Sequence, residues 1–253
     1  METILKTENL TKQYRRVCAV DRVSLTIEKG DIFGFIGENG AGKTTFMRMI
    51  CGLIRPTGGT LELFGRTSEK ELPQMRKKMG ALIEHPAVYT GMSAMENLEV
   101  QRRYLDTDFD DNPKGALMEL LELVGLKDVK DRKAGKFSLG MRQRLGLAIA
   151  LVGNPEFLIL DEPTIGLDPI GVIELRELIL KLNHEKHITI LFSSHNLAEM
   201  AQIATRYGFL HKGKLLELIS AEKVKQTCED KGMTLESYFV ELLLGSREGN
   251  RHG

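Results

Sequence analysis

The 253 residues of the chain are enough to bury a sizeable core and fall within the range of one large α/β domain. Lysine plus arginine balance aspartate plus glutamate at 35 each, which argues against a nucleic-acid binder because phosphate neutralisation usually leaves a basic surplus. The apolar runs are too short to span a bilayer, and no signal-like segment opens the chain. The three cysteines form no metal-ligand pattern. We therefore expect a soluble cytoplasmic protein.

The first part of the chain is predicted to form strands. ILKTENLTKQY (4–14) and RVSLTIEKG (22–30) are typical of two strands separated by a polar turn. DIFGFIG (31–37) has the nearly continuous apolar character of a buried strand, and it leads directly into a glycine-rich loop.

That loop, GENGAGKTT, contains the spacing G-x-x-x-x-G-K-T between a strand and an apolar helix. A glycine-rich turn alone is more often a plain connector, but the lysine–threonine pair and the strand–helix context favour a phosphate-binding loop. Its backbone N–H groups can hold oxyanions, Lys43 can reach the β- and γ-phosphates, and the Thr44 hydroxyl can ligate Mg²⁺. The residues predicted to bind the nucleotide here are consecutive: Gly37, Glu38, Asn39, Gly40, Ala41, Gly42, Lys43, Thr44 and Thr45.

After the loop, two further strands precede a helical block. GGTLELFG (58–65) is typical of a short edge or hairpin strand, and MGALIE (79–84) of another buried strand. From about 86 to 152 the apolar spacing becomes helical. Ser93 and Glu96 form a capping box at the start of the first helix of this block.

The segment FLILDE places two carboxylates at the end of a buried strand, where α/β sheets bind ligands. Asp161 is predicted to hold Mg²⁺, directly or through water, and Glu162 to polarise a water for in-line attack on the γ-phosphate. An Asp-Glu pair after a strand is usually a helix cap, and Pro163 agrees with that interpretation. The presence of the Lys43 loop in the same chain favours catalysis.

His195 follows another apolar strand, ITILFSS (188–194). A lone histidine at a strand end is usually structural. A parallel sheet, however, would bring it to the same edge as Glu162 and Lys43, where its ring could contact the γ-phosphate.

The alternation of strands and helices predicts an α/β fold with a mostly parallel sheet covered on both faces. We expect one domain over residues 1–220, with a helical subdomain inserted at about 86–152. Residues 221–253 are expected to form a C-terminal helical appendage that contains an amphipathic helix, TLESYFVELLLG.

Five motifs in a fixed order closely resemble the ATP-binding subunits of ABC transporters. They are GENGAGKTT, FSLGMRQR (137–144), LILDEPT (158–164), GLDP (166–169) and SSH (193–195). The resemblance covers about residues 4–220. It implies a P-loop NTPase fold of the ABC ATPase type, with an antiparallel β part beside the parallel core, and Mg²⁺-dependent ATP hydrolysis coupled to transport.

The resemblance also implies roles for individual residues. Asp161 and Glu162 match the family's Mg²⁺-binding and hydrolytic carboxylates, and His195 matches its switch histidine. Asp168 matches the loop that contacts a second subunit. Tyr14 lies where the family places an aromatic side chain that stacks on adenine, although alone it would be an ordinary strand tyrosine.

Residues 138–141 correspond to the family's signature loop, which binds the γ-phosphate of a nucleotide held by another subunit. The resemblance therefore implies a head-to-tail homodimer that encloses two ATP molecules. Ser138 can donate its hydroxyl, and Gly140 permits close approach of the backbone. The family has Gly-Gly-Gln where this chain has Leu139-Gly140-Met141, so a normally flexible position carries a bulky side chain.

Glu84, in ALIEHPAVY, stands where most of the family has a glutamine that offers a neutral oxygen to Mg²⁺. As a metal ligand, Glu84 would add negative charge near Asp161 and Glu162 and favour protonation of one carboxyl. The acidic residue and the HPAVY after it resemble the ATPases of bacterial exporters for bacitracin and lantibiotics, which serve resistance or self-immunity.

The pore is expected to come from separate integral-membrane permease subunits, with this chain peripheral on the inner face of the cell membrane. The family docks its permease beside the Glu84 loop, where Tyr89, Met92 and Met95 either contact the partner or pack internally.

Two alternative functions belong to other functional classes, and a third differs only in the cargo. A non-transport ABC ATPase acting on nucleic acid or ribosomes should carry long heptad insertions or two cassettes, which this sequence lacks, and we expect no nucleic-acid partner. A non-hydrolysing, ATP-gated module is disfavoured by Glu162 and His195. An exporter subunit for another substrate, such as a drug or lipid, stays open.

Overall fold

The computed structural model describes residues 2–106 and 112–249. Its first strands form an antiparallel sheet of three strands in the order β2-β1-β4. These strands are β1 (Thr3–Tyr14), β2 (Val17–Glu28) and β4 (Gly58–Leu63). β2 begins earlier than predicted, because Val17 already pairs with Tyr14 across a two-residue turn.

The second sheet has six strands in the order β5-β6-β7-β3-β8-β9, parallel except for β9, which runs antiparallel to β8. The predicted mostly parallel core and the antiparallel part beside it are therefore confirmed. All residues of β3, β6 and β7 are buried, which explains their continuous apolar sequences. The strands are β3 (Ile32–Ile36), β5 (Met79–Leu82), β6 (Phe157–Asp161), β7 (Thr189–Ser194), β8 (Arg206–His211) and β9 (Lys214–Ser220).

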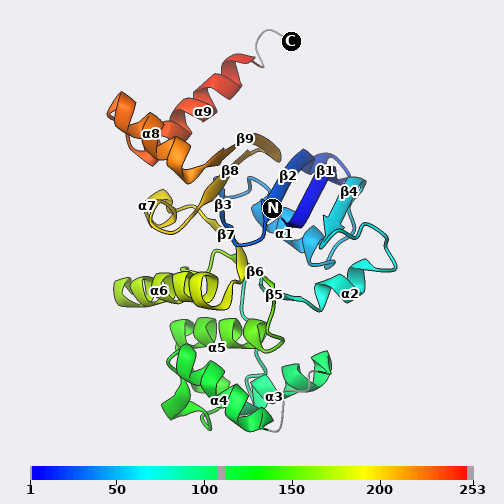
Figure 1. Ribbon diagram of the computed structural model, residues 1–253, viewed down its shortest axis with the longest axis vertical. Helices are drawn as coiled ribbons and strands as arrows, with labels where there is room; N and C mark the ends of the chain where they lie inside the picture. Colours follow the sequence, from blue (N-terminus) through cyan, green and yellow to red (C-terminus); the bar gives the residue numbers. More distant parts are fainter. Residues whose placement is uncertain (1, 107–111, 250–253) are drawn as a thin grey trace.

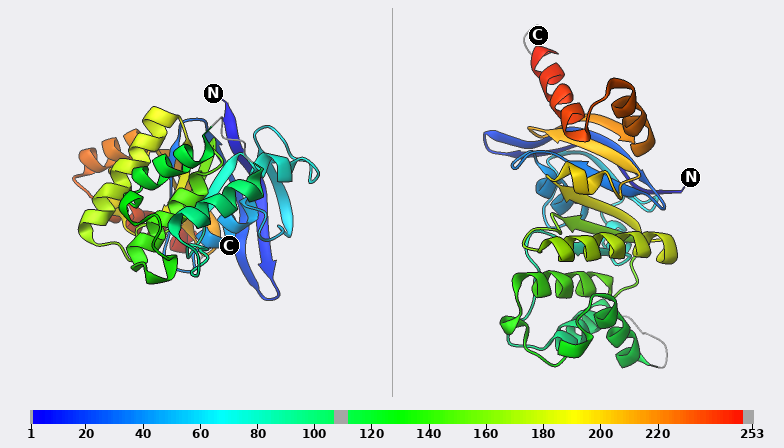
Figure 2. Two further views of the ribbon diagram at one scale, coloured as in Figure 1. Left: turned by 90° about the horizontal axis from the view of Figure 1, so that it is seen from below. Right: turned by 90° about the vertical axis from the view of Figure 1, so that its left-hand side faces the viewer.

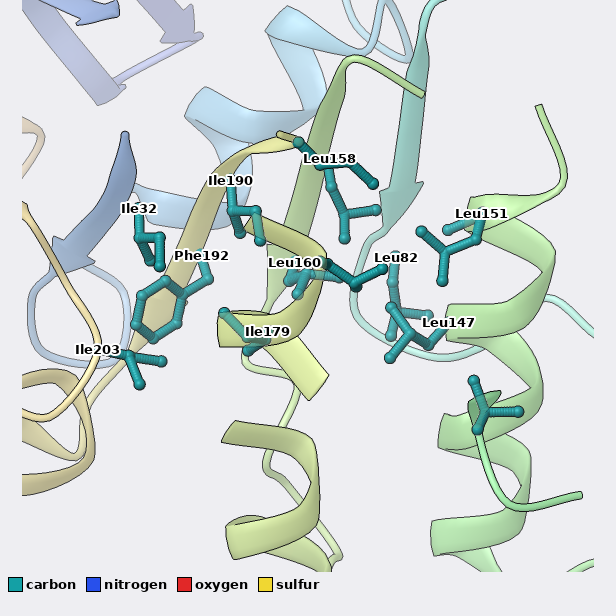
Figure 3. Packing of buried hydrophobic residues seen from close by; sticks show 14 of the residues in the cluster. Ile32, Leu82, Leu147, Leu151, Leu158, Leu160, Ile179, Ile190, Phe192 and Ile203 are labelled. Atoms are coloured by element: carbon teal, nitrogen blue, oxygen red, sulfur yellow. The ribbon is translucent and has the colours of Figure 1, made fainter. Parts of the chain in front are cut away.

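Alternate residues of these strands enter two separate cores, because successive side chains of a strand point to opposite faces. Phe157 and Ile159 of β6 face the three-stranded sheet and helix α1 (Lys43–Ile50). Leu158 and Leu160 face the other core, which includes residues of α5 (Leu139–Leu151) and α6 (Pro169–Lys186) (Figure 3). The central sheet is thus held from both faces.

The helical block lies at one end of the molecule, and the C-terminal helices lie at the other (Figures 1 and 2). The capping box at Ser93 and Glu96 is confirmed, because each residue's side chain accepts a hydrogen bond from the other's backbone N–H. Besides α5, the block consists of α3 (Ala94–Leu105), α4 (Pro113–Leu123) and two short 3₁₀ helices, η1 (Lys127–Val129) and η2 (Ala134–Lys136).

The C-terminal helices share the core of the sheet. The ring of Phe239 stacks on Phe209 of β8 with centroids 5.6 Å apart, and the Tyr238 hydroxyl donates to Glu217 of β9 at 2.8 Å. Among the described residues, no helix combines the length and the apolar character needed to cross a membrane. The remaining helices are α2 (Leu72–Arg76), α7 (Leu197–Met200), α8 (Ala221–Lys231) and α9 (Leu235–Gly249).

Candidate active site

The glycine-rich loop connects the end of β3 to the start of α1, and its close packing requires glycine. Gly40 and Gly42 have φ values of 80° and 109°, in the left-handed region that favours glycine. A Cβ on Gly37 would lie 2.5 Å from the carbonyl oxygen of Leu210, and one on Gly42 would overlap the carbonyl of Ala19. The loop backbone therefore packs against the backbones of β2 and β8.

Lys43 lies inside this loop, with only 5% of its surface exposed. Its Nζ donates to the carbonyl oxygens of Gly37 at 2.5 Å and Glu38 at 3.3 Å, and it lies 3.2 Å from Oε1 of Glu162. The ammonium is therefore buried and held by three oxygens.

Asp161 and Glu162 are positioned by the strand next to theirs. Asp161 pairs in register with Ser193 of β7, and the Ser193 hydroxyl donates to Asp161 Oδ1 at 2.7 Å. The same hydroxyl oxygen accepts from the Glu162 backbone N–H at 2.9 Å. Glu162 itself has φ of 49°, so the chain turns sharply just after the strand. Ser193 thus fixes both carboxylates at the carboxyl edge of the sheet.

The Glu162 side chain lies between Lys43 and His195. Its Oε2 is 2.8 Å from Nδ1 of His195, a residue whose side chain is 53% exposed. Its Oε1 is buried near Lys43 but accepts no hydrogen bond. One carboxylate oxygen is therefore oriented by the histidine, and the other is paired with the lysine.

A cavity of about 410 Å³ lies over the loop. Of the nine loop residues predicted to bind the nucleotide, all except Gly37 line it, together with Glu162. It is also lined by residues with no predicted role: Val17, Cys18, Ala19, Lys212 and Gly213.

The unforeseen lining comes from the start of β2 and from the β8–β9 turn. Gly213 in this turn donates its N–H to Ala41 at 2.8 Å and accepts from Asp21 at 2.8 Å, so the turn joins the loop to β2. The Lys-Gly pair between two strands is the one sequence signal that could have revealed it.

Tyr14, Asp161 and His195 do not line this cavity themselves. Tyr14 pairs across the sheet with Val17, which does, and Lys12 Nζ lies 5.0 Å from the centre of its ring. Asp161 is 1% exposed and is hydrogen-bonded to Ser193, which also accepts from the backbone N–H of Glu162.

Glu84 lies outside the cavity as well. It has φ of 58°, and its Oε2 forms an ion pair with Arg48 at 2.7 Å. Arg48 follows Thr44 by one turn of α1. The negative charge of Glu84 is therefore balanced by an arginine on the helix that begins at the loop.

The donor groups around the loop fit Mg²⁺. In the part of the chain that the structure describes, no group of three or more acidic, histidine or cysteine side chains is placed so that it could hold a metal ion by itself. Mg²⁺ does not need one, because it usually binds one or two carboxylates together with phosphate oxygens and waters. Thr44 lines the cavity, and Asp161 lies at the carboxyl end of β6, which is separated from β3 by β7.

The second predicted anion-binding turn is elsewhere in the chain. Ser138 caps α5, its Oγ accepting from the Met141 N–H at 3.2 Å, and Asp168 caps α6, its Oδ1 accepting from the Gly171 N–H at 2.8 Å. The cavity over the loop contains none of Ser138, Gly140 and Asp168.

Comparison with known proteins finds similarity to ATP-binding proteins of transporters. Residues 20–165 match the family described as ABC transporter. The bacitracin transport ATP-binding protein BcrA of Bacillus licheniformis is 46% identical over 89% of this chain and 72% of its own length. The lantibiotic transport ATP-binding protein SrtF of Streptococcus pyogenes is 41% identical over 84% of this chain and 89% of its own.

Solved structures agree with the fold. The dimeric ATP-binding cassette MJ0796 bound to ADP and Pi, in a post-hydrolysis state, is 25% identical with a TM-score of 0.79, covering 86% of this chain and 99% of its own. An ATP-binding subunit of an ABC transporter is 26% identical with a TM-score of 0.84, covering 95% of this chain and 99% of its own.

Proposed function

The chain belongs to the ABC transporter family and is an ATPase of that type, and from this premise we propose that it drives export of a peptide antibiotic such as bacitracin or a lantibiotic. The export path would be a separate membrane permease, to which the chain binds on the inner face of the membrane. The cargo is inferred from the two relatives named for bacitracin and lantibiotic transport.

The hydrolytic step is supported most directly by the position of Glu162. We propose that a water donates a hydrogen bond to Oε1, transfers its proton there and attacks the γ-phosphorus. The bond to the β-phosphate oxygen breaks, and ADP leaves with the electron pair. His195 on Oε2 and Ser193 on the backbone N–H keep the carboxylate aimed during this step.

The charge of the nucleotide would be met by the loop and its neighbours. Lys43 would exchange the carbonyl oxygens of Gly37 and Glu38 for the β- and γ-phosphates. Thr44 and Asp161 would hold Mg²⁺, which when bound neutralises charge on the phosphate oxygens. Glu84 is the further predicted ligand, and it would have to leave Arg48 to reach the ion.

We also propose that two copies of the chain associate head to tail. Ser138, Gly140 and Asp168 lie away from the cavity over the loop of their own chain, so they are available to the nucleotide of a second copy. Near the expected permease surface, Tyr89 and Met92 are 58% and 37% exposed, whereas Met95 packs against the core. Tyr89 and Met92 are the better candidates for a partner contact.

Co-expression with the permease in a sensitive bacterial host tests the proposal. Resistance to bacitracin or a lantibiotic should rise with the intact chain and return to the basal level with Glu162→Gln at equal protein abundance. A lipid or drug in place of the peptide would show as resistance to that compound only. Resistance that is unchanged by Glu162→Gln would exclude ATP hydrolysis as the driving step.

A further inference from the structure

The loop that begins α5 and the loop that precedes α6 interlock within one chain. The first consists of the N-cap Ser138 and the first three residues of α5, is called here the 138–141 loop, and carries Leu139. The second, residues 166–168, carries Leu167. A Cβ on Gly166 would overlap the Leu139 side chain, lying 2.8 Å from its Cγ. A Cβ on Gly140 would lie 3.2 Å from Cδ2 of Leu167. Each leucine therefore lies on the glycine of the other loop.

This packing accounts for the bulky residue in the 138–141 loop. Leu139 stands where the ABC transporter family has a glycine, and its side chain remains 41% exposed. Gly166 has φ of 81°, a conformation that an ordinary side chain adopts only with strain. The space that Gly166 leaves empty is occupied by Leu139, so the large residue and the small one are complementary.

Two polar contacts extend the same junction toward the active site. The buried Gln143 of α5 donates from Nε2 to the carbonyl of Pro163, the residue after Glu162, at 3.2 Å. Arg144 of α5 forms an ion pair with Glu174 of α6. The start of α5 is thereby attached to the segment between the catalytic carboxylate and α6.

We propose that Leu139 is a positioning residue that makes the 138–141 and 166–168 loops one unit, which a second copy of the chain meets as a single preformed surface. The inference rests on the head-to-tail dimer of the proposed function. Because the two loops are already ordered against each other, association does not have to order them separately. The effect is expected on dimer affinity and not on nucleotide binding by one copy, whose cavity lies elsewhere.

The test uses the full chain in a Glu162→Gln background, which should hold ATP without hydrolysing it. Sedimentation with ATP and Mg²⁺ measures the dimer, and a fluorescent ATP analogue measures nucleotide affinity at a concentration where the chain is monomeric. Leu139→Ala should raise the Kd of the dimer about tenfold, equivalent to one lost apolar anchor. Nucleotide affinity should stay the same, and the melting temperature should fall by only roughly 2–4 °C because Leu139 is 41% exposed. Leu139→Met should retain most of the dimer affinity.

Two further variants complete the design. Leu167→Ala removes the reciprocal leucine and should weaken the dimer in the same direction. Leu53→Ala removes a leucine that is 63% exposed and distant in sequence from both loops, and should change nothing.

The outcomes distinguish failure of the dimer from failure of the positioning role of Leu139. If the Glu162→Gln chain with Leu139 intact stays monomeric with ATP, the dimer of the proposed function is wrong. If it dimerises and Leu139→Ala and Leu167→Ala dimerise equally well, the dimer stands and the positioning role of Leu139 is wrong.

Discussion

Two helix N-termini of the chain are predicted to bind anions, and they are built differently. The loop before α1 holds a buried lysine, requires glycine because the backbone of β2 and β8 presses on it, and lies under a cavity. The start of α5 has a serine cap and an exposed leucine, and the cavity does not reach it. The first is a site enclosed by its own chain, whereas the second is a surface presented outward. In the head-to-tail dimer proposed above, a complete site would combine the first half of one chain with the second half of another.

The largest expected effect is on the enclosed half. Glu162→Gln removes the proton acceptor while keeping the shape of the side chain, so hydrolysis should fall about 10³-fold. ATP binding should persist, because Lys43 and the loop amides are untouched. Phosphate release and equilibrium binding of a fluorescent ATP analogue measure the two effects separately. Hydrolysis at near-normal rates would show that Glu162 is not the base.

Lys43→Ala should weaken nucleotide binding itself, by about 30- to 100-fold, because it deletes charge-assisted hydrogen bonds to the phosphates. Lys214→Ala is the matched control. That lysine is exposed on the nearby strand β9, pairs with Asp21 at 3.7 Å and does not line the cavity. Isothermal titration should show a loss of ATP affinity only for Lys43→Ala. Equal losses of affinity in both variants would mean that only the net positive charge of the chain matters.

Several parts of this site were visible in the sequence. The β3 and β6 strands are continuous apolar runs, and the G-x-x-x-x-G-K-T spacing and the Ser93–Glu96 box are local patterns that need no tertiary information. The mostly parallel α/β fold followed from the same alternation of strands and helices.

The rest depended on contacts between distant segments. Ser193 holds Asp161 only because β7 lies beside β6, a neighbour relation that the order of elements along the chain does not fix. Lys212 reaches the cavity because the β8–β9 turn packs on the loop. The partner of Glu84 is Arg48 on α1, a pairing that only the folded chain reveals.

Ser138→Ala addresses the outward half and should have a smaller effect. Removing the N-cap of α5 should cost about 1 kcal/mol of unfolding free energy, or roughly 2–4 °C in melting temperature. If Ser138 also contacts the nucleotide of a second copy, ATP-dependent dimerisation of the Glu162→Gln chain should weaken further than this stability loss explains. Asn112→Ala is a control, because Asn112 caps α4 in the same way. Equal behaviour of the two variants would leave Ser138 as a cap only.

The smallest expected effect concerns Glu84, which is the further predicted Mg²⁺ ligand and is paired with Arg48 of α1. Its ion pair with Arg48 is half-exposed and therefore worth at most about 1 kcal/mol, so release of Glu84 toward a metal would cost little. Glu84→Gln should leave ATP binding intact. It should raise the Mg²⁺ concentration for half-maximal hydrolysis by about two- to fivefold, because it removes a negatively charged ligand. Arg48→Gln should shift it in the opposite direction, because it frees the carboxylate without removing it. A Mg²⁺ titration of ATPase activity that is identical for both variants and the parent chain would mean that Glu84 never reaches the ion, and that its pairing with Arg48 is its whole role.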